Sequence, residues 1–585
     1  MPSYLKLTNE AYRLKLDYKT EAPAPLSGLV AARRDTAAFQ LIVQSDRQYS
    51  VSVGTGEWFS AKGQHAGPHE RLRVAVEAPF PVKLHLEEFI TDDDCIEKAD
   101  ILLNQDVRES RGGIPSAVWA EVCVPEDAKA GSYFVTARLY SAFYNDDETL
   151  VDTQTIPLTV SSYVLPEAKD WKFYLDLWQH TSNIARKHDV QLWSEEHFEV
   201  LKSYAASLAA LGQKSITVCA SQIPWQGQGC VREFEFGGNL FEYSMIPVTK
   251  KKDGAFFFDY SKMQKYIDIC TEAGMSGDIE IFGLVNLWQA PELKSGILCP
   301  DYVENIRIRY LDESDGCLKY VREGEVLKQY IRSLEKYFIT TGQIDRVRIA
   351  ADEPGDVEHY RASLNMIREL APNFRCKCAI NHAEFIGEFH DYIDDFVPYL
   401  NCAVKEYKLM KQYRQLYPAK KFMWYNCCGY LRPNTFLRTP LIESRIIGIM
   451  TSFLRLDGFL RWNYAIWPDD PRHEIRYSNF EAGDTNFVYP GYNGKVLLSL
   501  RYKNLQRGIA DYELLELLRA QKGDAAADAA IEKLMRTDLL ELFWKDAHLG
   551  PIEERESYDL FSADWEDYNS FKKAILELLQ TKDSE

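Results

Sequence analysis

The middle of the chain contains the stretch Val347-Arg348-Ile349-Ala350-Ala351-Asp352-Glu353-Pro354. Apolar side chains alternate at Val347, Ile349 and Ala351, which is the pattern of a buried strand. Pro354 has no backbone N–H, so this strand is expected to end beside two carboxylates. Two adjacent acids repel each other, which raises the pKa of one and leaves the other ionised. The alternative is that Asp352 and Glu353 only cap the helix that follows.

Strand-like and helix-like segments alternate on both sides of this stretch. The expected strands are 173–178, 215–220, 278–285, 346–351, 375–380, 395–399, 422–426 and 458–464. The expected helices are 195–211, 260–273, 325–338, 357–370, 384–390, 408–417, 441–454 and 505–519. Eight alternating strands and helices predict a (β/α)8 (TIM) barrel over residues 166–520. A doubly wound sheet is the alternative, but no glycine-rich phosphate loop opens any of these helices.

The segments that flank the predicted barrel have different patterns. Residues 1–165 contain short segments rich in β-branched and aromatic residues, which predict a β-sandwich with a structural role; they include 39–44, 72–76, 118–124, 133–139 and 155–160. Residues 521–585 contain helical patterns, which predict a helical C-terminal extension packed on the barrel. The chain is therefore expected to be a multidomain α/β protein with boundaries near residues 165 and 520.

Composition narrows the function classes. The 585-residue chain has a net charge of −19 and no basic cluster longer than Lys250-Lys251-Lys252, which argues against nucleic acid as a partner. No segment has the length and apolarity of a membrane span or a signal peptide, so we expect a cytoplasmic protein without a membrane partner, or a secreted one if a signal has been trimmed. The 12 cysteines lack metal-site spacing, and we predict no metal or cofactor.

Aromatic and polar residues gather where the predicted strands end. In a barrel the carboxyl ends of the strands form the active site. Aromatic faces stack on sugar rings, while amides, imidazoles and carboxylates bind hydroxyls, so this collection predicts a carbohydrate site. Each residue alone also fits a packing role. Beside the acid pair, the set comprises Trp178, His180, Asn286, His382, Trp424, Tyr425, Trp462 and Trp467.

Two later segments, together with the acid pair, resemble glycoside hydrolase family 123. They are Gly483-Asp484-Thr485-Asn486-Phe487-Val488-Tyr489-Pro490-Gly491 and residues 499–515. The resemblance implies an N-terminal β-sandwich, a (β/α)8 catalytic domain and β-N-acetylgalactosaminidase activity. It also implies that Asp352 orients the 2-acetamido group of the sugar and that Glu353 is the general acid/base. Asp484 and Tyr489 join the expected substrate-binding residues, while the loop 468–473 differs enough to leave the exact sugar open.

The expected activity is that of a retaining exo-β-N-acetylgalactosaminidase. Adjacent acids cannot straddle the anomeric carbon, but they can act on one side of a sugar whose own acetamide attacks to form an oxazolinium intermediate. The expected partner is a glycan with a terminal N-acetylhexosamine. The alternatives are a catalytically silent carbohydrate-binding protein and a β-glycosidase for another sugar, such as N-acetylglucosamine. If the acetamide is not the nucleophile, Asp484 or another acid would have to be.

Overall fold

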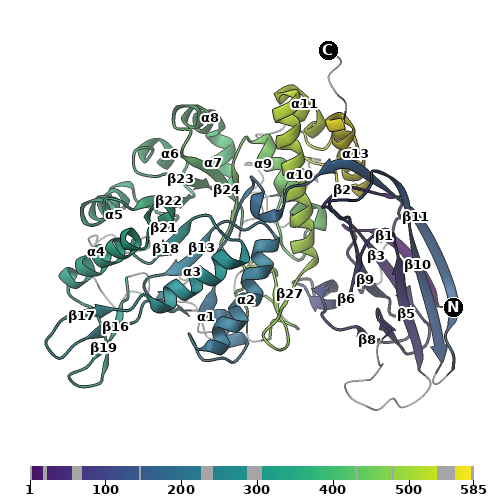
Figure 1. The fold of residues 1–585 in the computed structure, drawn as a ribbon, viewed down its shortest axis with the longest axis horizontal. Coiled ribbons are helices and arrows are strands. Elements are labelled where there is room, and N and C mark those ends of the chain that lie inside the picture. Colours follow the sequence, from purple (N-terminus) through teal and green to yellow (C-terminus); the bar gives the residue numbers. More distant parts are fainter. Residues whose placement is uncertain are drawn as a thin grey trace.

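Figure 1 shows sheets at the N-terminal end, a curved body of strands and helices, and the long helix α10 (Leu500–Lys522) between them. The computed structural model describes residues 3–17, 23–55, 69–143, 146–224, 241–285, 306–427, 432–468, 470–473, 475–476, 480–536 and 560–580. No helix within these ranges is long and apolar enough to cross a membrane.

The N-terminal part contains two sheets that share one hydrophobic core. The first has the order β1 (Tyr4–Asn9), β3 (Thr36–Gln44), β9 (Ser116–Cys123), β6 (Val82–Thr91) and β7 (Glu97–Leu102). The second has the order β2 (Leu29–Arg33), β11 (Thr149–Val164), β10 (Gly131–Phe143), β5 (Glu70–Glu77), β4 (Tyr49–Ser52) and β8 (Val107–Ser110). Phe39 and Val118 of the first sheet and Val74 and Leu139 of the second belong to the same buried cluster. Each N-terminal segment that the sequence predicted as a strand lies in one of these sheets.

The first sheet is buried on both faces. Side chains alternate along a strand, so Phe39 faces the second sheet while Ile42 faces the other way. Ile42 packs in a cluster that includes Leu441 of α9 (Leu441–Phe453) and Leu500 of α10. The N-terminal sheets therefore pack directly on the outer helices of the curved body.

The curved body is an eight-stranded parallel sheet. Its strands are β12 (Tyr174–Leu177), β13 (Ile216–Cys219), β18 (Ile279–Phe282), β21 (Val347–Asp352), β22 (Arg375–Ile380), β23 (Asp395–Pro398), β24 (Lys421–Tyr425) and β25 (Gly458–Arg461). Their spatial order is β12-β25-β24-β23-β22-β21-β18-β13, so from β13 to β25 each strand lies beside the next one of this sheet, and β12 and β13 are the two edges. The prediction of eight parallel strands is confirmed, and each lies within two residues of its predicted start.

The backbone ladder is not closed between the two edge strands, β12 and β13. One parallel bridge joins Leu175 to Gln213. Elsewhere along this seam side-chain amides replace backbone pairs: Gln213 Oε1 accepts from Leu177 N–H at 2.8 Å, and Gln179 Oε1 accepts from Thr217 N–H at 2.7 Å. The predicted closed barrel is therefore observed as a curled sheet whose edges meet through side chains.

Helices cover the outer face of this sheet (Figure 1). Besides α9 and α10 they are α1 (Thr181–Lys187), α2 (Glu195–Ala210), α3 (Ser261–Ala273), α4 (Gly324–Thr340), α5 (Val357–Leu370), α6 (Phe385–Glu388), α7 (Leu400–Lys405) and α8 (Tyr407–Leu416). A small sheet that the sequence did not predict interrupts the alternation, in the order β17 (Phe256–Phe258), β16 (Val248–Lys250), β19 (Arg309–Asp312) and β20 (Leu318–Tyr320). Two short hairpins pair β14 (Ile223–Pro224) with β15 (Phe241–Glu242) and β26 (Tyr489–Pro490) with β27 (Val496–Leu497).

The C-terminal helices α11 (Asp524–Ile531) and α13 (Trp565–Gln580) follow α10. Lys572 of α13 and Arg507 of α10 both pair with the buried carboxylate of Asp35, at 2.6 and 3.3 Å. The extension was expected to pack on the barrel, but α13 also bonds the N-terminal sheets, where Gln580 donates to Ser161 Oγ at 2.5 Å. The boundaries at residues 165 and 520 stay predictions.

Candidate active site

The acid pair lies at the carboxyl end of β21. The side chain of Ala350 belongs to the cluster inside the curled sheet, whereas Ile349 and Ala351 belong to the outer core. Asp352 is two residues beyond Ala350 and pairs in register with Ala379, which also faces inward, so Asp352 is on the inner face. Glu353 continues the ladder by donating its N–H to Ala379 O at 2.9 Å.

The alternative that the two acids only cap a helix is wrong. The N-cap of α5 is Asp356, whose Oδ1 accepts from His359 N–H at 2.7 Å. Glu353 instead has a φ of 42°, a left-handed conformation that costs a residue other than glycine about 1–3 kcal/mol. Such strain persists where the surroundings hold the residue in place, and it is concentrated at functional sites.

Two side chains from neighbouring strand ends hold the Glu353 carboxylate. Tyr425, the last residue of β24, donates its hydroxyl to Oε1. Asn381, just after β22, donates to Oε2 at 3.3 Å. Neither Tyr425 nor Asn381 was predicted as a partner of Glu353, because a hydrogen bond between strand ends leaves no signal in the sequence.

The pKa of Glu353 is raised above its usual value. Burial is the main cause, and the Tyr425 hydrogen bond and the His382 charge oppose it. The sequence predicted a raised pKa for one acid of the pair, and burial raises the pKa of Glu353. Burial raises the pKa of the Tyr425 hydroxyl well above its usual value, and the charge of Glu353 raises it further. Tyr425 therefore keeps its proton and remains a hydrogen-bond donor.

A second buried acid stands at the end of β25. Asp484 pairs with Arg461 at 2.7 Å and accepts from Trp462 Nε1 at 3.3 Å. Burial raises the pKa of Asp484 to about 6, although Arg461 opposes the shift. Trp462 is half-buried, packs on Phe480 at 5.0 Å between ring centroids, and borders the inner cluster. Asp484 thus anchors the end of β25 and orients Trp462.

Three residues predicted to bind substrate lie elsewhere. Trp424 precedes Tyr425 in β24 and therefore faces the opposite side, where its Nε1 donates to Thr451 Oγ1 of α9 at 2.8 Å. Trp467 is buried against Tyr204 of α2 and donates to Val488 O at 2.8 Å. Tyr489 donates to Asp100 of the N-terminal sheets at 2.7 Å. The three side chains thus lie in the core or at the interface with the N-terminal sheets, and a role for them in substrate binding stays a prediction.

Of the remaining predicted residues, two are buried, one is half-exposed and one lies outside the described residues. Trp178 is buried in the inner cluster, edge-on to Phe282 at 4.9 Å between ring centroids. His180 is buried at the start of α1, and burial lowers its pKa to about 3, so it is neutral. His382 is half-exposed and stacks on Phe385 at 5.3 Å, near enough for its charge to act on Glu353. Asn286 lies outside the described residues.

The described ranges contain no group of three or more His, Cys, Asp or Glu side chains arranged to hold a metal ion. The arrangement offers an inward-facing carboxylate at Asp352, a second carboxyl with a raised pKa at Glu353, and an aromatic edge at Trp462. These groups can donate a proton and stabilise a positive charge on one side of a bound sugar.

The model of the glycoside hydrolase 123 catalytic domain matches residues 178–518. The chain belongs to glycoside hydrolase family 123. A solved family 123 glycoside hydrolase from Clostridium perfringens, studied for glycolipid glycan hydrolysis, has 16% sequence identity and a TM-score of 0.72, with 99% of this chain and 97% of that chain covered. This likeness extends the shared fold to the N-terminal sheets and C-terminal helices.

A β-D-glucuronidase from Dictyoglomus thermophilum has 11% identity and a TM-score of only 0.30, with 81% of this chain and 66% of that chain covered, which supports no inference. No curated protein sequence matches this chain. Family 123 membership makes the chain a glycosidase and identifies its substrate as a carbohydrate.

Trp424 and Trp462 are expected to respond differently to replacement by alanine. Trp424→Ala removes a fully buried ring and should lower the free energy of unfolding by about 3–5 kcal/mol, while the folded fraction keeps its catalytic efficiency. Trp462→Ala should raise KM by about two- to tenfold, because it removes a half-buried aromatic surface that borders the inner cluster. Thermal melts and steady-state kinetics test this pair. A stable Trp424→Ala variant with a raised KM would reverse the two assignments.

Tyr425→Phe is expected to move the pH profile upward. The Tyr425 hydrogen bond lowers the pKa of Glu353, so its loss raises that pKa further. A general acid works in its protonated form, and activity falls as pH rises through its pKa. The alkaline limb of the kcat/KM profile should therefore shift to higher pH in the variant. If the alkaline limb of the kcat/KM profile stays in place or moves to lower pH, Glu353 is not the titrating acid.

Proposed function

We propose that this family 123 glycosidase is a retaining exo-β-N-acetylgalactosaminidase that uses the acetamide of its substrate as the nucleophile. The observation that carries the proposal is the adjacency of Asp352 and Glu353 at one strand end, with Asp352 on the inner face and Glu353 held by Tyr425 and Asn381. Both carboxyls approach a sugar from one side, which does not suit a separate enzymic nucleophile opposite the acid.

In this proposal Glu353 protonates the leaving oxygen. Its raised pKa keeps a larger fraction of the carboxyl protonated near neutral pH than an exposed glutamate would have. Asp352 faces the acetamide N–H and stabilises the positive charge that develops as the acetamide carbonyl attacks the anomeric carbon. Glu353, now ionised, then deprotonates the water that opens the oxazolinium ring, which gives overall retention of configuration.

We propose that Trp462, which borders the inner cluster, stacks on the sugar, and that His382, whose charge acts on Glu353, contacts its hydroxyls. For the curled sheet we propose the working geometry of a (β/α)8 barrel, closed through Gln179 and Gln213. The Clostridium perfringens relative was studied on glycolipid glycans, and we extend that substrate class to this chain.

A panel of chromogenic β-glycosides tests the sugar specificity. The β-N-acetylgalactosaminide should be hydrolysed with the highest kcat/KM, followed by the N-acetylglucosaminide, with the galactoside nearly inert. Preference for the N-acetylglucosaminide would leave the mechanism intact and change the sugar. No hydrolysis of any panel member, together with binding of the sugars, would favour a catalytically silent carbohydrate-binding protein.

A further inference from the structure

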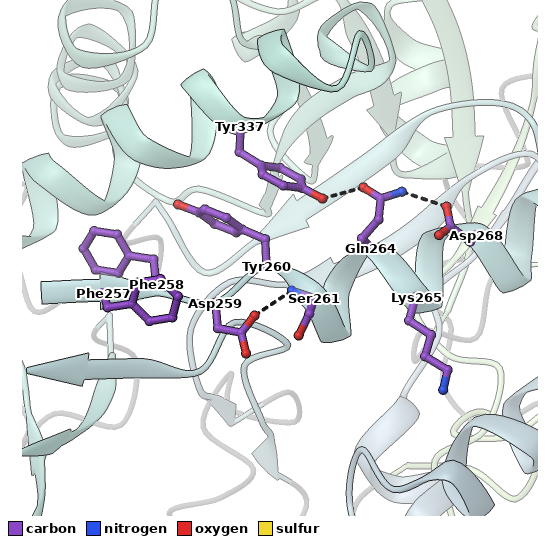
Figure 2. Close-up of a pocket in the computed structure, with 9 residues that line it drawn as sticks. All are labelled: Phe257, Phe258, Asp259, Tyr260, Ser261, Gln264, Lys265, Asp268 and Tyr337. Carbon is purple, nitrogen blue, oxygen red and sulfur yellow. Dashed lines mark hydrogen bonds between the residues drawn. The ribbon is translucent and has the colours of Figure 1, made fainter.

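A cavity of about 470 Å³ lies on the outer side of the curled sheet (Figure 2). It is formed where β17 meets the first turns of α3 and the last turns of α4. None of its lining residues belongs to the candidate active site. Any ligand that it holds is therefore bound separately from the acid pair.

Four aromatic side chains line this cavity: Phe257, Phe258, Tyr260 and Tyr337. Phe257 is 53% exposed, which is unusual for so large an apolar side chain. Tyr260 and Tyr337 lie side by side, with ring centroids 4.4 Å apart and planes 31° apart. The Tyr260 hydroxyl donates to Ser333 Oγ at 2.8 Å, which fixes its ring. The lining thus includes two tyrosine rings that pack on each other and an exposed phenylalanine ring.

Polar groups line the cavity beside these rings, and they include both donors and acceptors. Tyr337 donates its hydroxyl to Gln264 Oε1 at 2.7 Å, and Gln264 Nε2 donates to Asp268 Oδ1 at 2.7 Å, as Figure 2 shows. The Gln264 amide has a second N–H, and the Asp268 carboxylate has further lone pairs. A sugar hydroxyl both donates and accepts, so it matches this pair of groups.

The charges of the cavity disfavour an anionic ligand. Asp259 and Asp268 both line it, while Lys265, the lining cation, is paired with Glu195 at 2.5 Å. A phosphate or sulfate would meet uncompensated negative charge there. The aromatic rings and the neighbouring donor and acceptor groups together fit a neutral, hydroxyl-rich ring.

We propose that this cavity is a second carbohydrate-binding site, which holds a neutral sugar unit of a glycan while the active site works on a terminal sugar. The inference rests on the proposed function, because a second sugar site benefits an enzyme that acts on glycans. Contact at two places raises the effective concentration of a multivalent glycan at the active site.

Binding stoichiometry of the Glu353→Gln protein tests the proposal. The probe is a neutral oligosaccharide that ends in β-linked N-acetylgalactosamine, titrated by calorimetry and counted by native mass spectrometry. Two molecules should bind per chain. Phe257→Ala/Gln264→Ala, added to Glu353→Gln, should weaken the second site by about tenfold or more and leave one molecule bound. Phe134→Ala is the matched control, since Phe134 is a 67% exposed ring on β10. In this variant two oligosaccharide molecules should still bind per chain.

The outcomes separate this inference from the proposed function. One bound molecule that the cavity substitutions do not affect would overturn the inference and leave the proposed function standing. One bound molecule that those substitutions abolish would support the cavity and count against sugar binding beside Asp352 and Glu353. No bound sugar, with a variant that melts like the parent, would overturn the inference.

Discussion

Replacing Glu353 by glutamine is expected to lower kcat on an unactivated disaccharide by about 10²–10⁴-fold, the usual contribution of a positioned acid/base group. Glutamine keeps the size of the side chain and one oxygen that can accept from Tyr425, but its NH2 group cannot accept from Asn381 and cannot act as an acid toward the leaving oxygen. An aryl glycoside with a good leaving group needs less protonation and should lose less. The dependence of kcat/KM on leaving-group pKa should therefore steepen in the variant.

Asp352→Asn should behave differently from Glu353→Gln. It removes the charge that faces the acetamide, so its loss of rate should persist with good leaving groups. Glu384→Gln is the matched control, because that carboxylate is 63% exposed, lies 3.4 Å from His382 and has no proposed role. Near-normal activity of either acid variant on the disaccharide would overturn the assignment, as would an equal loss in the control.

The eight parallel strands were predictable because each is a short apolar run between helical patterns. Such a run is recognised as a strand even when its ends are misplaced by a residue or two. The seam between β12 and β13 was not, since amides of Gln179 and Gln213 act there in place of backbone pairs. The small sheet of β16, β17, β19 and β20 was missed because its strands are only three or four residues long and are interrupted by turns such as Lys251–Gly254.

Residues at the strand ends were harder to assign than the strands. Trp424 and Tyr425 are adjacent, so only one of them can face the interior, and a one-residue error exchanges the two. Tyr489 bonds Asp100, almost 400 positions earlier, which no local pattern reveals. The strained φ of Glu353 also escaped prediction, because glutamate, unlike glycine, does not signal a left-handed conformation.

A glycoside with a 2-hydroxyl in place of the 2-acetamido group is expected to be nearly inert, although it fits the same pocket. In the proposed mechanism the acetamide carbonyl attacks the anomeric carbon, so the hydroxyl substrate lacks the nucleophile. A thiazoline analogue should inhibit competitively because it resembles the oxazolinium species. Fluorine atoms added to the acetyl methyl withdraw electrons and should slow turnover progressively. Steady-state kinetics on the mono-, di- and trifluoroacetyl series measures this trend.

The alternative to substrate assistance is an enzymic nucleophile, and the structure argues against Asp484 in that role. Asp484 was the acid to which the role of nucleophile would pass, but it is fully buried and held by Arg461 and Trp462. Freeing its carboxylate to attack a sugar would take the negative charge away from the buried Arg461 guanidinium, which would keep only neutral partners such as Asn434, at a cost of about 3–5 kcal/mol. Substrate assistance needs no such rearrangement. Efficient cleavage of the 2-hydroxyl substrate, or a covalent sugar on the protein detected by mass spectrometry, would rule out the acetamide as the nucleophile.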